Sequence, residues 1–248
     1  MSSTPRKSAF VSGAGRNIGR AIVLELADQG INVAINGHSD RAACEEVAAA
    51  AKAKGVETMV VMGDVGKSAE VARMAKEVLA RFGSVQVLVN NAAIRPEKPF
   101  LEMSDEDWHR VLDVDLNSAF YTARAFLPGM VEKKWGRVVN LTGMNAIHGY
   151  RGRAPVSAAK HGLWGLTKAL AKEFGPHGIT SNAISPGPIR SAHRDESMTH
   201  HIESMVKMIP LGHIGDPDHI AGLTGHLVSE RGGFINGQMI ACNGGGQT

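Results

Sequence analysis

The sequence has few cysteines. Cys44 and Cys242 stand alone, with no C-x-x-C spacing. Two isolated thiols argue against a disulfide framework and favour a reducing compartment. No run of about 18 apolar residues is present, so we expect no segment to span a membrane. The first residues also lack the apolar stretch of a secretory signal, and we therefore expect a cytoplasmic protein.

The sequence also lacks blocks of like charge. It has 27 Lys and Arg against 24 Asp and Glu, a net charge of +3. This balance argues against a nucleic-acid or membrane surface, so the expected partner is a small-molecule substrate. The length of 248 residues, 43% of them hydrophobic, suits one domain with a sizeable core over residues 1–248.

Short apolar runs alternate with longer helical patterns along the chain. The runs are nearly continuous, as expected for strands of a parallel sheet that is covered on both faces. The expected strands are 9–13, 31–35, 56–62, 85–90, 137–141, 179–184 and 234–240. The expected helices are 18–29, 41–54, one capped by Ser68, a long one framed at its start by Ser104 and Asp107, and one begun by Asp216 and Pro217. The alternation predicts an α/β fold with a doubly wound parallel sheet.

One long polar segment, 191–208, follows a Pro-Gly-Pro and contains no strand pattern. We expect it to form a lid over the site, at about 190–210. It contains His193, Asp195, Glu196, His200, His201 and Glu203. Their spacing fits no zinc pattern, so no metal is expected.

A glycine-rich stretch, "VSGAGRNIGRAI", follows the first expected strand and opens the first helix. Gly13, Gly15 and Gly19 let backbone N–H groups approach a pyrophosphate at a helix N-terminus. Turns also use glycine for ordinary structural reasons. The order strand, loop, helix favours a nucleotide site.

Five further segments match one family together with this loop. They are "GDV" at 63–65, "NNAA" at 90–93, "SNAISPGPI" at 181–189, "PLGHIGDPDHIA" at 210–221 and "INGQMIACNGGG" at 235–246. Over nearly its whole length the chain resembles the short-chain dehydrogenase/reductase family. The resemblance implies a Rossmann-type doubly wound, seven-stranded parallel sheet flanked by helices, and a homotetramer or homodimer. Asn17 replaces the middle glycine of the loop, and asparagine tolerates a left-handed backbone; Ala93 replaces a family glycine.

The resemblance implies a dinucleotide cofactor. The residues that it assigns to binding are Gly13, Arg16, Asn17, Ile18, Gly19, His38, Asp64, Val65, Asn91, Ala92, Lys160, Pro186, Gly187 and Ile189. No acidic residue stands at the tip after the second strand, where one would hold the ribose 2′-hydroxyl of NAD. Arg16, His38 and Arg41 can face a 2′-phosphate, which favours NADP and leaves NAD possible. The alternative is that these three are solvated loop charges.

The family's catalytic set of Asn, Ser, Tyr and Lys is retained only at Lys160. Its Tyr-x-x-x-Lys aligns with Val156-x-x-x-Lys160, Gly143 stands at the Ser, and Asp115 stands at the Asn. General acid–base help typically contributes about 10²–10⁴-fold to a rate, and one oxyanion donor about 10²–10³-fold. The sequence therefore predicts an atypical active site.

Several residues are candidates for rebuilding the site. Tyr150 and His148 lie in the loop before the Lys160 helix and can supply a phenol or an imidazole; the alternative is that both are pocket-wall or surface residues. Asp115 either forms a buried ion pair with Lys160 or acts as an acid/base group. Two other arrangements stay open, a Ser157-x-x-Lys160 nucleophile and a clamp for an acidic substrate, made by Arg151 and Arg153.

Three functions follow as hypotheses. The first is an NAD(P)-dependent oxidoreductase of the short-chain type, acting on an unknown carbonyl or alcohol with a non-standard proton donor. The second is a non-redox enzyme, such as a lyase, isomerase or hydrolase, on the same fold. The third is a catalytically silent nucleotide-binding protein.

Overall fold

The computed structural model describes residues 6–191 and 206–246 and contains one seven-stranded parallel sheet. Its strands are β1 (Ser8–Val11), β2 (Asn32–Gly37), β3 (Thr58–Met62), β4 (Val87–Asn90), β5 (Gly136–Leu141), β6 (Ile179–Pro186) and β7 (Met239–Cys242). Their order is β3-β2-β1-β4-β5-β6-β7. The chain order reverses between β1 and β4, which makes the carboxyl ends of these strands the expected place for a ligand. The predicted doubly wound sheet is confirmed.

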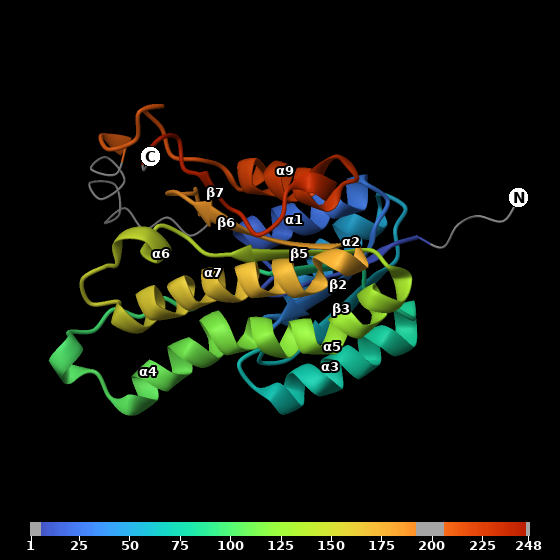
Figure 1. The fold of residues 1–248 in the computed structure, drawn as a ribbon, viewed down its shortest axis with the longest axis horizontal. Coiled ribbons are helices and arrows are strands. Elements are labelled where there is room, and N and C mark those ends of the chain that lie inside the picture. Colours follow the sequence, from blue (N-terminus) through green and yellow to red (C-terminus); the bar gives the residue numbers. More distant parts are fainter. Residues whose placement is uncertain (1–5, 192–205, 247–248) are drawn as a thin grey trace, which may run out of the picture.

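Helices cover both faces of the sheet. They are α1 (Asn17–Asp28), α2 (Arg41–Lys52), α3 (Ser68–Phe82), α4 (Asp105–Leu112), α5 (Ser118–Lys133), α6 (Asn145–His148), α7 (Ala154–Phe174) and α9 (Pro217–Val228). Figure 1 shows α1, α2 and α9 on one side and α3, α5 and α7 on the other. The described helices contain none that is both long and apolar enough to cross a membrane.

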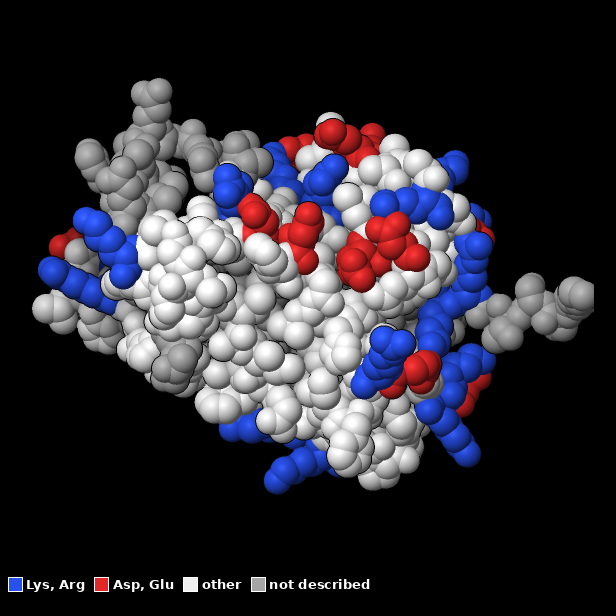
Figure 2. Space-filling model, turned by 90° about the horizontal axis from the view of Figure 1, so that it is seen from above, with Lys and Arg blue, Asp and Glu red and all other residues white. Residues whose placement is uncertain are grey.

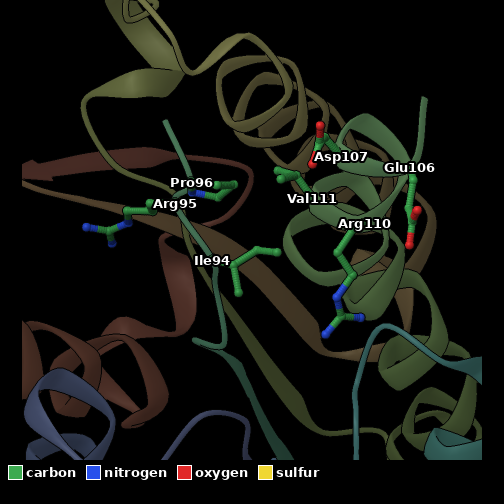
Figure 3. Close-up of a pocket in the computed structure, with 7 residues that line it drawn as sticks. All are labelled: Ile94, Arg95, Pro96, Glu106, Asp107, Arg110 and Val111. Carbon is green, nitrogen blue, oxygen red and sulfur yellow. The ribbon is translucent and has the colours of Figure 1, made fainter. Parts of the chain in front are cut away.

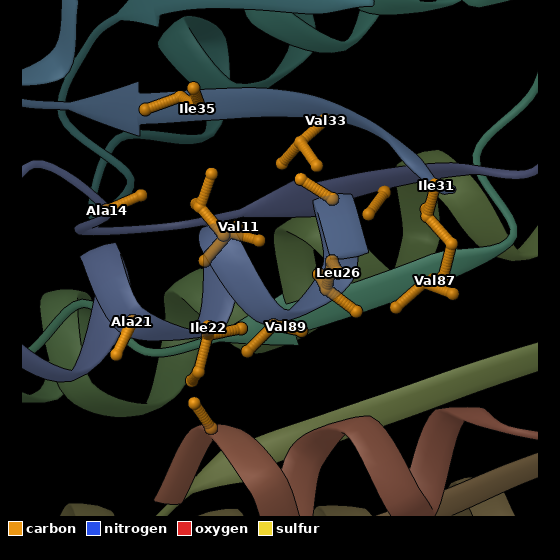
Figure 4. Packing of buried hydrophobic residues seen from close by; sticks show 14 of the residues in the cluster. Val11, Ala14, Ala21, Ile22, Leu26, Ile31, Val33, Ile35, Val87 and Val89 are labelled. Atoms are coloured by element: carbon orange, nitrogen blue, oxygen red, sulfur yellow. The ribbon is translucent and has the colours of Figure 1, made fainter. Parts of the chain in front are cut away.

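Two hydrophobic clusters form the core, one on each face. Alternate residues of β1 divide between them, because successive side chains of a strand point to opposite faces. Val11 packs with Ile22 and Leu26 of α1 (Figure 4), whereas Phe10 packs with Phe126 of α5, with ring centroids 5.1 Å apart. Each fully buried large apolar side chain contributes roughly 1.5–3 kcal/mol.

The structure corrects two of the predicted element ends. Ser68 is the first residue of α3 rather than its cap. Lys67, in an extended conformation, holds the cap position and makes no side-chain capping bond. The Glu70 carboxylate accepts from the backbone N–H of Asp64. The expected strand 234–240 is shorter, since Phe234 lies in a 3-10 turn and the strand begins only at Met239. The capping box of Ser104 and Asp107 and the start of α9 at Asp216 and Pro217 are confirmed.

The long helix predicted from Ser104 is interrupted by a π-helical turn. This turn, Asp113–Asn117, joins α4 to α5. Such a turn inserts one extra residue and is frequent at functional sites. Here it carries Asp115, whose side chain is buried.

Candidate active site

The turn between β1 and α1 brings its backbone very close to the loop after β4. A Cβ atom at Gly13 would lie 2.9 Å from the Cα of Ala92, and one at Gly19 would lie 2.3 Å from the Gly13 carbonyl oxygen. Gly13 also has a φ of +61°. Both positions therefore exclude a side chain, as a backbone that must approach a pyrophosphate closely requires.

Asn17, which replaces the middle glycine of the loop, has the left-handed backbone that this replacement predicts. Its φ is +47°, one of two positive values among described non-glycine residues. Its Nδ2 donates to the Ser191 hydroxyl at 3.4 Å. The loop thus keeps a glycine-like shape, while its side chain reaches the segment that leads into 192–205. Residues 192–205, which contain the histidines and carboxylates of the predicted lid, lie outside the described residues.

Ser12 and Asn91 lock the two loops together. The Ser12 hydroxyl accepts hydrogen bonds from the backbone N–H groups of Asn91 and Ala92, both at 3.0 Å. The Asn91 amide donates back to the carbonyls of Ser12 and Gly13. The cradle is therefore held rigid by bonds that cross the switch point.

Two of the three cations expected at a 2′-phosphate are engaged with carboxylates. Arg16 pairs with Asp40, and Arg41 lies 3.5 Å from Glu45. Asp40 also caps α2 by accepting from the Ala43 N–H. The hydrogen bonds from Ala43 and Arg16 lower the pKa of Asp40. His38 is exposed directly after β2.

The other residues assigned to cofactor binding lie at the same end of the sheet. Asp64 follows β3 and binds Arg110 at 2.8 Å. Burial raises its pKa, but the hydrogen bonds from the Gly66 N–H and Arg110 outweigh this and lower it. Gly187 follows β6 and donates to the Cys242 carbonyl, and Ile189 bridges to Gly215. Ile18, Val65 and Pro186 complete the set that was predicted there.

Lys160 and Asp115 form a buried ion pair. The Lys160 Nζ lies 3.4 Å from the Asp115 Oδ2 and donates to the Leu141 carbonyl at 2.9 Å. The other oxygen of Asp115 accepts from the Ile94 N–H at 2.8 Å. Each residue is 2% exposed. The structure thus brings together the two residues for which the sequence left a buried pair or an acid/base pair open.

Burial acts on both members of this pair. It raises the pKa of Asp115, against the attraction of Lys160, and lowers the pKa of Lys160, against the attraction of Asp115. The positive charge of Arg95 acts on both groups as well, lowering each pKa. Burial thus shifts the two pKa values towards one another, and the ion pair opposes this shift.

Gly143 and Val156 leave the polar positions of the family empty of polar side chains. Val156 is completely buried, and Gly143 has a φ of +128° with open space where a Cβ would lie. A valine offers no proton and no hydrogen bond. Neither side chain can therefore donate a proton at these two positions.

Tyr150 and His148 are both exposed on the loop before α7. The Arg153 guanidinium lies 4.8 Å from the centre of the Tyr150 ring and 3.1 Å from Glu97. Lys98 donates its N–H to the Gly152 carbonyl, so the loops after β4 and β5 are tied together. Arg153 is thus occupied by a carboxylate.

Ser157 does not reach Lys160 through any contact that the structure records. Its hydroxyl is buried with no hydrogen-bond partner, whereas Lys160 bonds to Leu141 and Asp115. A serine nucleophile needs its base within hydrogen-bond reach. The geometry gives the Ser-x-x-Lys alternative no support.

A pocket of about 500 Å³ lies between the loop after β4 and α4 (Figure 3). Its walls are Ile94, Arg95, Pro96, Glu106, Asp107, Arg110 and Val111. Sequence reasoning missed Arg95 and Arg110. The available signal was their position: Arg95 stands two residues after "NNAA", and Arg110 stands five residues before Asp115 on the expected helix. No group of potential metal ligands occurs in the part of the chain that the structure describes.

Comparison with known proteins places the chain in a family. A family model described as "Enoyl-(Acyl carrier protein) reductase" matches residues 13–247. The chain is 40% identical over 239 residues to the 3-oxoacyl-(acyl-carrier-protein) reductase FabG of Staphylococcus epidermidis, covering 96% of this chain and 98% of that one. It is 36% identical over 239 residues to the enzyme of that name from Pseudomonas aeruginosa, covering 96% of each.

A solved structure agrees with this assignment. It is that of a candidate short-chain alcohol dehydrogenase from Sinorhizobium meliloti 1021, with a TM-score of 0.92 and 29% identity, covering 98% of this chain and 97% of that chain. The fold is thus that of a nucleotide-binding α/β oxidoreductase. The chain belongs to the short-chain dehydrogenase/reductase family.

Proposed function

We propose that the protein is an NAD(P)-dependent oxidoreductase that interconverts a carbonyl compound and an alcohol. The observation that carries the proposal is the glycine turn, which excludes a Cβ at Gly13 and Gly19 and is bonded to Asn91 and Ala92 across the switch point. Relatives named as 3-oxoacyl-(acyl-carrier-protein) reductases support carbonyl reduction as the reaction class.

The residues present fit a bound dinucleotide. Backbone N–H groups of the turn and the N-terminus of α1 would hold the pyrophosphate, and Asp64 and Val65 would lie beside the adenine. The nicotinamide ring, when bound, supplies or accepts the hydride. NADP is the proposed form and NAD stays possible, because Arg16 and Arg41 already have carboxylate partners.

We also propose that the protein is an atypical member of its family. Val156 and Gly143 stand where the family has its Tyr and Ser, so the proton must come from Tyr150 or His148 on the loop before α7. Lys160 holds the floor of the site together with Asp115 through the Leu141 carbonyl. The proposal includes one domain, cytoplasmic location and a homotetramer or homodimer.

A second function is favoured by one observation. The Lys160 ammonium is turned inward and is 2% exposed, and the proton-donating side chains of the family are absent at 143 and 156. A protein that binds a dinucleotide and turns nothing over would have these features. In this alternative the protein binds the dinucleotide at the glycine turn and catalyses no reaction.

A two-stage experiment separates these functions. NADPH is titrated into the protein while the fluorescence of its three Trp residues is followed, with NADH in parallel. A panel of carbonyl compounds is then added, and loss of the reduced nicotinamide absorbance is measured. Binding followed by oxidation supports the oxidoreductase, binding with no oxidation across the panel supports the silent protein, and no binding of either nucleotide rejects both.

A further inference from the structure

Most cations beside the candidate active site are neutralised by a partner. Lys160 pairs with Asp115, Arg153 with Glu97, and Arg110 with Asp64. Lys98 likewise pairs with Asp107 at 2.6 Å. These ion pairs cancel most of the charge around the pocket.

Arg95 differs from these cations. No carboxylate pairs with it among the described residues, and its side chain is exposed. Its positive charge nevertheless acts on the buried pair, because it lowers the pKa of both Asp115 and Lys160. Arg95 therefore carries a charge that no ion pair among the described residues neutralises, and it shares the pocket with Glu106.

The backbone around Arg95 fixes its place. Ile94 is anchored by its N–H to Asp115, and the loop is tied further on by the bond from Lys98 to Gly152. Figure 3 shows the Arg95 side chain turned away from Arg110, with Glu106 across the pocket on α4. The backbone at Arg95 is thus held beyond the carboxyl end of β4, beside the switch point where open α/β sheets bind their ligands, and the exposed guanidinium projects from there.

A second cation without an ion pair lies near Arg95. The strands run towards the left in Figure 1, and Figure 2 shows Lys and Arg side chains at the left edge of the molecule, with acidic side chains among them and both charges mixed further along this face. Arg151, on the loop before α7, is exposed and has no ion pair in the described part of the chain. Arg95 and Arg151 thus lie on two loops that are tied together by the bond from the Lys98 N–H to the Gly152 carbonyl, and both charges favour an anion there.

From this arrangement we infer that the site takes a carbonyl or alcohol substrate that also bears a carboxylate, and that Arg95 binds this carboxylate. A guanidinium is planar and presents paired N–H groups that match the two oxygens of a carboxylate. The inference rests on the proposed function, since it names the substrate class of the same site. The inferred substrate differs from a neutral thioester in its carboxylate, and Arg95 is the residue that determines this substrate preference.

The test compares two ligands that differ only in the anionic group. Acetoacetate and its neutral methyl ester are titrated calorimetrically into the protein saturated with NADP⁺, and then into the protein alone. We expect acetoacetate to bind at least tenfold more tightly than the ester. Arg95→Gln is expected to remove this difference by weakening acetoacetate alone, and Arg95→Lys to retain part of it.

The controls separate this inference from the proposed function. Arg231→Gln removes an exposed cation from the 3-10 turn before β7, at the opposite end of the sheet, and is expected to change neither ligand. NADPH binding is measured for each variant and is expected to stay constant. Equal binding of acid and ester, failure of both to bind, or an unchanged preference in Arg95→Gln overturns the inference, as does loss of NADPH binding in that variant. Failure of the proposed function is read separately, from nucleotide binding and oxidation in the unmodified protein.

Discussion

Lys160 and Asp115 face each other inside the protein, with the Nζ of one 3.4 Å from the Oδ2 of the other. The Leu141 carbonyl holds the ammonium from the sheet side, and the Ile94 N–H holds the carboxylate from the loop after β4. The pair therefore joins α7, β5 and the π-helical turn beneath the switch point. It occupies the floor of the site, where the family has a lysine and an asparagine.

Breaking this pair is expected to destabilise the protein. Asp115→Asn leaves the Lys160 ammonium buried without a counter-ion, and removing one partner of a buried pair costs about 3–5 kcal/mol. Urea unfolding followed by circular dichroism measures the loss. Asp113→Asn, two residues away in the same turn and only half-buried, is the matched control and is expected to be nearly neutral.

The loss in Asp115→Asn is expected to depend on pH. Burial lowers the pKa of Lys160, and Asp115 opposes this, so the variant has a Lys160 pKa still further below the value in the unfolded state. The unfolded state of the variant therefore binds the proton of this lysine more tightly than the folded state does. Stability of the variant should therefore rise with pH until the unfolded lysine deprotonates. Unfolding at neutral pH and at mildly alkaline pH measures this slope, and a variant that loses stability as the pH rises would contradict the assignment.

Removing the proton donor is expected to lower turnover without affecting nucleotide binding. If Tyr150 donates the proton, Tyr150→Phe lowers kcat by about 10²–10⁴-fold and leaves the affinity for NADPH unchanged. His148→Asn tests the imidazole in the same assay. The donor is whichever change removes turnover, and full activity in both variants would place the proton donor on another element.

The fold was predictable because most strands are buried runs rich in apolar residues and several helices, such as α2, α4 and α9, begin at a local capping signal. The capping box of Ser104 and Asp107 involves residues three positions apart, and the positive φ of Asn17 follows from its own side chain. Local chemistry of this kind is visible in a sequence.

The floor and rim of the site were less predictable. Lys160 bonds to Leu141, 19 residues away, and Asp115 faces it only because a π-helical turn adds a residue to the helix. The importance of Arg95 follows from the pairing of most neighbouring cations, which depends on the packing of separate segments. Such relationships depend on which strands are neighbours, and no local pattern encodes them.

Removing the charge of Asp40 is expected to shift cofactor preference towards NADPH. Asp40 holds Arg16 in an ion pair and also caps α2. Asp40→Ser keeps a capping side chain and removes the carboxylate that competes with a 2′-phosphate for the Arg16 guanidinium. The ratio of NADPH to NADH affinity, measured by Trp fluorescence, should rise several-fold. Glu46→Gln, at an exposed glutamate on α2, is the control for loss of an acidic charge nearby.

The carboxyl of Asp107 is expected to have a pKa well below that of an ordinary aspartate. The hydrogen bonds from Lys98 and from the N–H and hydroxyl of Ser104 lower the pKa of Asp107 to about 2. A pKa below the unfolded value means that this group stabilises the fold above the unfolded pKa, and that its contribution is lost as the pH falls towards 2. Lys98→Met should raise the Asp107 pKa towards its ordinary value of 3.8, as measured by an NMR titration of the side-chain carboxyl. Lys76→Met, an exposed lysine on α3, should leave it unchanged; an equal shift in both variants would show that general surface charge, rather than the bond from Lys98, sets this pKa.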